Sequence, residues 1–166
     1  MSDGETDDSE IDGATEGTFL VTHADDGSAV LRDVERGQVH TLSSNPGLSE
    51  DDAVDGVVAP EPPLEVTAEL VEVEERRPLS IRESREPPTK QEREIAAEQS
   101  VGELTKEERA GIGELHVISV PEGETEAAVE DVLDDREATL GRAARLGVNR
   151  VEIRSEPGVV SVRYLP

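Results

Sequence analysis

The sequence predicts an α+β protein with two folded parts, on the evidence of three patterns. Short β-rich runs separated by turn residues fill 17–75. A strand, two amphipathic helices and two further strands follow one another in 114–166. The stretch between them, 76–113, holds paired prolines and a single clear helix signal. We therefore expect a small β-barrel-like domain, a linker with a surface helix, and a C-terminal α+β layer.

Five strands are expected in 17–75. They cover 18–22, 29–32, 38–42, 54–58 and a long run from Leu64, with Asp-Gly, Arg-Gly and Asn-Pro-Gly turns between the earlier ones. In the fifth of these segments, apolar residues alternate with polar ones at Leu64, Val66, Ala68 and Leu70. The next apolar residue is Val71, one position out of this alternation. Such a shift indicates a β-bulge near Leu70. The pattern is typical of a small antiparallel barrel of the OB-like or SH3-like kind, and a plain meander is the alternative.

The central stretch 76–113 is predicted to be a linker between the two folded parts. Pro87 and Pro88 stiffen the chain and prevent a helix from continuing through them. Thr89 and Glu92 then fit a capping box that opens a helix over about 90–100. Because this helix has few apolar residues, we expect it on a surface. A second short helical turn is expected over 105–110.

The C-terminal stretch 114–166 predicts the order strand, helix, helix, strand, strand. Apolar residues recur at helical spacing in both helices, and Gly147 stands where a helix-ending glycine belongs. The last strand should turn Val160, Val162 and Tyr164 inward. The helix residues that carry the pattern are Val129, Val132, Leu133, Leu140, Ala143 and Ala144.

The composition is strongly acidic. Forty Asp and Glu against 16 Lys and Arg give a net charge of −24, and 14 of the 16 basic residues are arginine. The first 16 residues carry seven acids and predict a disordered tail, yet removing them still leaves −17. Molar salt shortens the screening length to about 3 Å and removes most of the self-repulsion. The charge therefore predicts a halophilic archaeal protein; the alternative is an ordinary acidic protein.

Several classes of protein are excluded or disfavoured by composition. The chain has no cysteine, so disulfides, thiolate metal sites and cysteine nucleophiles are excluded. It has no apolar run long enough to span a membrane. Its acidic start lacks the basic and apolar regions of a signal peptide. We expect a cytoplasmic protein without a membrane partner.

Four segments resemble a known family. They are Gly17–His23, Gly113–Val117, Arg142–Val148 and Val160–Pro166. They are similar to those of a haloarchaeal family of small acidic proteins known only as a domain of unknown function. The resemblance covers nearly all of the chain after residue 16. It implies an intracellular haloarchaeal protein and supplies no activity, ligand or catalytic residue.

Three histidines are the candidates for a metal or catalytic site: His23, His40 and His116. His23 stands beside two aspartates at a strand end, and His40 is expected near it across a barrel. Two imidazoles and a carboxylate can bind a divalent metal, but nothing in the spacing requires it. We expect no catalytic residue, no metal and no cofactor. An enzyme would need a pocket in which one of these histidines meets buried acids.

A local excess of arginine is the candidate nucleic-acid site. Five arginines stand against two glutamates in the last 25 residues: Arg142, Arg145, Arg150, Arg154 and Arg163. If three of them share one strand face, they form a cationic patch that could meet phosphate. Pairing with acids of the neighbouring helices, such as Glu130, Asp134 and Asp135, is the expected arrangement.

We therefore expect a non-enzymatic module that acts through protein contacts, with a protein partner. The alternative is an RNA- or DNA-binding protein that uses the barrel face or the C-terminal arginines. The test between them is whether Arg150, Arg154 and Arg163 project together without a carboxylate nearby. The sequence does not fix the oligomeric state.

Overall fold

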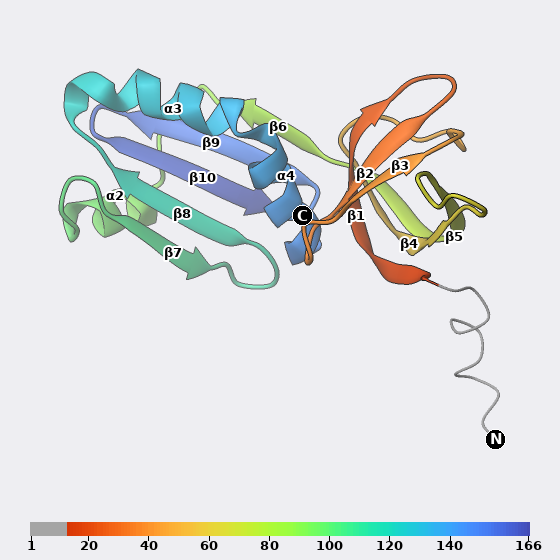
Figure 1. Cartoon of the computed structure of the whole chain (residues 1–166). Helices are drawn as coiled ribbons and strands as arrows, with labels where there is room; N and C mark the ends of the chain where they lie inside the picture. Colours follow the sequence, from red (N-terminus) through yellow and green to blue (C-terminus); the bar gives the residue numbers. More distant parts are fainter. Residues whose placement is uncertain (1–12) are drawn as a thin grey trace. The chain divides into compact units, whose positions relative to one another are not determined.

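The computed structural model describes residues 13–166. The chain forms two compact units, and the boundary between them in the sequence lies between Pro78 and Leu79 (Figure 1). Of the tail expected over 1–16, residues 1–12 lie outside the described residues. Thr15 and Glu16 already belong to the first strand, β1. No helix among the described residues is long and apolar enough to cross a membrane.

The first unit is a closed five-stranded barrel with the order β1-β2-β3-β5-β4. The strands are β1 (Thr15–Ala24), β2 (Ala29–Asp33), β3 (Val39–Leu42), β4 (Asp52–Pro60) and β5 (Ala68–Pro78). Because the barrel is closed, the alternative prediction of an open meander is wrong. The barrel closes through a parallel pair, Leu42 of β3 with Ala68 of β5, while its other ladders are antiparallel. Parallel closure between the third and fifth strands is the connectivity of an OB-fold rather than that of an SH3-like barrel.

The predicted bulge in the fifth strand is confirmed. Val57 pairs with Glu72 and Val58 with Leu70, so Val71 is the extra residue. The start of this strand was predicted wrongly. Leu64 and Val66 lie in the loop before β5 and are among the most exposed apolar residues of the described chain. The loop turns back on itself because Glu65 has φ of 60° and its N–H donates to the Glu61 carbonyl.

The second unit contains a five-stranded sheet with the order β6-β9-β10-β8-β7. Its strands are β6 (Ser80–Glu83), β7 (Leu104–Glu108), β8 (Glu114–Ser119), β9 (Arg150–Glu156) and β10 (Val159–Leu165). The helices are α2 (Lys90–Ala97), α3 (Thr125–Asp134) and α4 (Arg136–Leu146), with a short 3-10 turn, η1 (Glu122–Glu124), before α3. The predicted order from β8 to β10 is confirmed.

The stretch expected to be a linker, 76–113, is largely part of this second unit. β6 pairs in parallel with β9, and α2 lies against the sheet. The helical turn predicted over 105–110 is wrong, because Leu104–Glu108 forms β7 and pairs with β8. Thr105 and Glu107 alternate with more exposed neighbours, and that period of two belongs to an edge strand.

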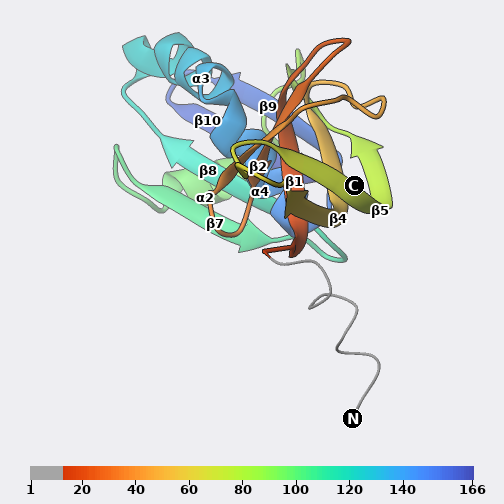
Figure 2. The same cartoon turned by 45° about the vertical axis from the view of Figure 1, so that its right-hand side comes forward.

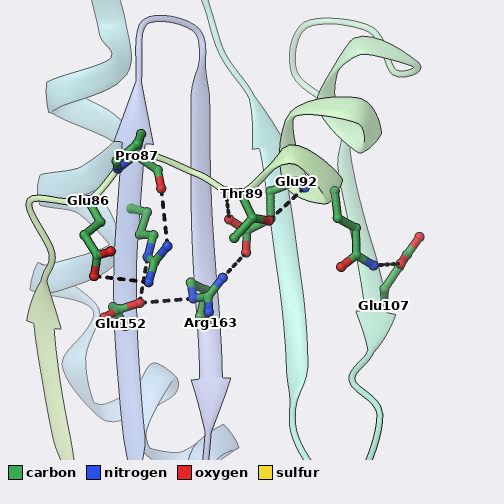
Figure 3. A network of polar contacts seen from close by, with 9 residues as sticks. Glu86, Pro87, Thr89, Glu92, Glu107, Glu152 and Arg163 are labelled. Carbon is green, nitrogen blue, oxygen red and sulfur yellow. Dashed lines mark hydrogen bonds and ion pairs between the residues drawn. The ribbon is translucent and has the colours of Figure 1, made fainter.

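The two faces of this sheet differ in character. Val160, Val162 and Tyr164 are buried on one face, as predicted, and Val162 and Tyr164 line a cavity together with Val132 of α3 and Thr139 of α4. Side chains alternate along β10, so Ser161 and Arg163 lie on the other face. There Arg163 contacts Glu92 of α2. Figures 1 and 2 show α3 and α4 along one side of the sheet, and Figure 3 views the α2 side.

Candidate functional site

The barrel carries a groove of about 310 Å³ beside β3. Val39, His40 and Thr41 of β3 form one wall, and Glu65, Val66 and Thr67 of the loop before β5 form another. The groove exists because β3 and β5 pair at one position only, Leu42 with Ala68, so the two strands diverge beyond it.

The edge of β3 is open along this groove. The N–H of Asp33 donates to the carbonyl of Gln38, which directs the main-chain groups of Gln38 toward β2. In an antiparallel ladder this direction alternates, so the main-chain N–H and C=O of Val39 point away from β2. Among the described residues no strand pairs with Val39 on that side. An open edge of this kind is a template for an added strand.

Apolar and acidic groups border the open edge together. Val39 and Val66, which line the groove, are 57% and 77% exposed, and Leu64, which precedes Glu65 in the same loop, is 78% exposed. Glu65 lines the groove, and Glu61 follows β4 directly. The hydroxyl groups of Ser43 and Thr67 donate to the Glu61 carboxylate and lower its pKa, so Glu61 keeps its charge. The border therefore offers apolar contact and negative charge.

His40 contributes the polar group inside the groove. Its ring meets the Phe19 ring edge-on, with the centroids 5.7 Å apart. Burial lowers the pKa of His40, which the nearby Asp33 only partly offsets, so the imidazole is neutral at pH 7. Its Nε2 is buried and has no hydrogen-bond partner within the described chain. Buried polar atoms are seldom left unpaired, so the Nε2 of His40 is an unusual feature of this wall of the groove.

The second unit contains a polar network between α2 and the sheet (Figure 3). We use "polar network" for Glu86, Glu92, Glu152, Arg154 and Arg163. Glu92 is 0% exposed; its Oε2 lies 2.6 Å from Nη1 of Arg163, and its Oε1 accepts from the main-chain N–H of Thr89. Nε of Arg163 lies 3.0 Å from Glu152 Oε1, an ion pair that lacks hydrogen-bond alignment.

The five predicted arginines do not form a common cationic surface. The register places Arg150, Arg154 and Arg163 on one face of the sheet, with Glu152 between them. Arg154 pairs with Glu152 at 2.8 Å and Arg163 with Glu92. Arg150 donates to the main-chain carbonyl of Pro166.

Arg142 and Arg145 lie on α4, away from that face. Arg142 donates twice to Glu114, at 2.8 and 3.0 Å, and Arg145 is exposed near the end of the helix. The partners suggested from sequence, Glu130, Asp134 and Asp135, belong to α3 and its end. They lie on the wrong side of the sheet to reach Arg154 or Arg163.

The three histidines are in separate places. His23 is exposed, 3.4 Å from Asp25 and 3.6 Å from Glu50. His40 lines the barrel groove. His116 is nearly buried in the second unit, where its Nε2 lies 2.8 Å from Glu114 Oε1. No group of three or more potential metal ligands occurs among residues 13–166.

The sequence did not predict that the charged side chains of Asp33 and Glu92 are fully buried. Asp33 is fully buried and accepts from the N–H groups of Glu35 and Arg36 and from the Arg36 guanidinium. The capping box at Thr89 did predict the bond between Glu92 and the helix start, and it is confirmed. The capping-box pattern does not predict that the Glu92 carboxylate also accepts a hydrogen bond from Arg163. The groove was missed because Leu64 and Val66 were assigned to a strand.

The fold and these features define a two-unit α+β protein, with an OB-type barrel that carries an acidic, apolar groove and a sheet layer held by buried ion pairs. The chain belongs to a family of unknown function, DUF5812, whose sequence profile matches residues 15–155. The predicted resemblance to a domain of unknown function is thereby confirmed. No curated protein and no solved structure matches the chain.

Proposed function

We propose that this protein is a non-enzymatic accessory module, and that the groove beside β3 binds an extended segment of a partner protein. The open edge of β3 carries the proposal. Addition of a strand at such an edge uses main-chain hydrogen bonds for affinity, and side-chain contacts on either side supply selectivity. The Val39 N–H and C=O are the groups that a partner strand would pair with, and Val66 lies across the groove from them.

The charge of the groove defines the chemistry of the partner segment. Residues 17–75 hold 14 acids and two bases. An acidic or phosphate-bearing chain would be repelled, while a segment that alternates apolar and basic side chains would complement both Val66 and Glu65. Complementary charge of this kind raises the association rate and selects among partners.

The test uses three probes with the full chain: a hexapeptide of alternating arginine and valine, its glutamate–valine counterpart, and a single-stranded oligonucleotide. We expect the basic peptide to bind and the other two not to bind in fluorescence anisotropy. The variant Val39→Pro removes one N–H that β2 does not use, and edge positions tolerate proline. It should weaken binding by about threefold to tenfold, the value of one hydrogen bond.

The matched control is Val39→Thr, which keeps the N–H and the β-branched shape and should bind almost as the parent does. Melting temperatures of both variants verify that the barrel is intact. Binding of the basic peptide that Val39→Pro leaves unchanged would contradict strand addition. Failure of the basic peptide to bind at all would overturn the proposal.

The alternative is an RNA- or DNA-binding protein. Its support is the OB connectivity, because OB barrels bind oligonucleotides across the face of their second and third strands. Against it stand the acidic groove and the carboxylate partners of Arg142, Arg154 and Arg163. Binding of the oligonucleotide in the same assay, at a strength that falls steeply with salt, would favour this alternative.

We further propose an intracellular protein adapted to high salt, on the strength of its −24 charge and its arginine-rich basic residues. The melting temperature should rise by roughly 10 °C, or ~2 kcal/mol, between low and multimolar KCl, because screening removes the repulsion among carboxylates. Differential scanning calorimetry measures the shift. Sucrose serves as the uncharged control, since it stabilises by exclusion and does not screen. A melting temperature that responds equally to both, or not at all to KCl, counts against the adaptation.

A further inference from the structure

The second unit contains a cavity of about 290 Å³ between the sheet and the helices α3 and α4. From the sheet, Leu104, His116, Ile118 and Tyr164 line it; from the helices, Val132 and Thr139 do. This cavity is independent of the barrel groove, because all of its lining residues belong to the second unit.

The cavity follows from the composition of the core. The chain has one Phe, one Tyr and no Trp, so it has few side chains bulky enough to fill the space over β7 and β8. α3 buries Val129 and Thr125 only, and Leu104 on the edge strand β7 is 45% exposed. An apolar gap of this kind lacks contacts that a bound molecule would supply. Its volume is near the lower end of the range for small-molecule sites.

Two polar atoms beside the cavity have unused hydrogen-bonding capacity. His116 uses Nε2 toward Glu114, which the Arg142 guanidinium holds in place from α4. Neither His116 Nδ1 nor the Tyr164 hydroxyl hydrogen-bonds to another group of residues 13–166, and neither atom is sealed from solvent. The two rings contact each other with centroids 4.8 Å apart. Because neither atom is sealed off, both can form a hydrogen bond with a group that enters the cavity.

The electrostatics select the charge of that ligand. Asp131 and Asp135 line the cavity and are exposed, which places them at its mouth. No basic residue lines it, although Arg142, Arg145 and Lys106 lie near enough to act on the two rings. Burial lowers the pKa of His116 and raises the pKa of Tyr164 to about 12, so both rings are neutral at pH 7. Neutral aromatic faces with carboxylates nearby attract cations.

We propose that this cavity binds a small organic cation, an amine with a compact apolar body. The apolar body fills the space between Ile118 and Val132, and the ammonium group lies at the mouth near Asp131 and Asp135. The Tyr164 hydroxyl and His116 Nδ1 supply the remaining polar contacts.

Three probes of one shape test the proposal: benzylamine, benzyl alcohol and benzoate. The full chain is titrated with each, and binding is followed by NMR of the His116 and Tyr164 ring protons. Tyr164 is the single tyrosine, so its signals are readily assigned. We expect saturable shifts with benzylamine, affinity about tenfold weaker for benzyl alcohol, and none for benzoate. Equal binding of benzoate, or no saturable binding of benzylamine, overturns the proposal.

Variants locate the site. Ile118→Phe and Val132→Phe each fill the cavity from a different wall and should abolish benzylamine binding, so one is sufficient if the other fails to fold. Ile112→Phe is the matched control, because Ile112 is exposed and lies outside the cavity. Asp131→Asn with Asp135→Asn should remove the preference for benzylamine over benzyl alcohol. Unchanged binding in both filled variants would contradict the assignment.

Discussion

Replacing Arg163 by methionine is expected to destabilise the second unit by about 3–5 kcal/mol. The loss is large because the substitution leaves the buried Glu92 carboxylate without its cationic partner. Glu92 is fully buried, and Arg163 Nη1, 2.6 Å away, is its only cationic partner among the described residues. A buried charge without a partner costs far more than the pair contributes when intact. Urea unfolding followed by Tyr164 fluorescence, the single tyrosine of a chain without tryptophan, measures the loss.

The double variant Arg163→Met with Glu92→Met should lose much less stability than the two single variants do together, because no charge is then buried alone. It still forfeits the bond from Glu92 to the Thr89 N–H, so full recovery is not expected. Arg150→Met is the matched control: Arg150 lies on the same sheet face but is exposed and bonds to a main-chain carbonyl. A cost below about 1 kcal/mol for Arg163→Met would mean that water reaches Glu92 and that the pair is only a surface contact.

The network also explains what local sequence patterns can and cannot predict. The capping box at Thr89 and Glu92 was predictable because both residues act within one helical turn. The bulge at Val71 and the helix end at Gly147 were predictable for the same reason, since each is a local feature of the chain. The partner of Glu92 was not, because Arg163 lies 71 positions away and reaches it only through the sheet register.

The candidate groove was hidden by a wrong strand start. Alternation from Leu64 to Leu70 has the period of a strand, yet a turn at Glu65 leaves Leu64 and Val66 exposed. Alternation cannot distinguish a strand from a loop that leaves apolar side chains exposed. The sequence named all three histidines as candidates for a metal or catalytic site, and the structure places them apart. The cavity beside His116 could not be predicted, since it depends on how far α3 and α4 extend over the sheet.

The second large effect is expected at Gly113, immediately before β8. Its φ is +103°, and a Cβ there would lie deep inside the van der Waals radius of the Tyr164 carbonyl oxygen, which is main chain and cannot move independently. Gly113→Ala should therefore cost about 3–5 kcal/mol, from a disfavoured backbone conformation together with a steric clash. The close approach keeps β8 against β10, the two strands that hold His116 and Tyr164.

Alanine substitutions at two other glycines distinguish the cost of the backbone conformation from the cost of the steric clash, in the same unfolding measurement. Gly111 has φ of +91° with open space around its Cβ position, so Gly111→Ala should show the backbone cost alone, about 1–2 kcal/mol. At Gly123 neither positive φ nor a neighbour within 4 Å is present, and alanine there should be neutral or stabilise by up to about 1 kcal/mol. If Gly113→Ala costs no more than Gly111→Ala, the main-chain contact with Tyr164 is not needed to hold the two strands together. Loss of benzylamine binding by a folded Gly113→Ala variant would instead tie this contact to the geometry of the His116 cavity.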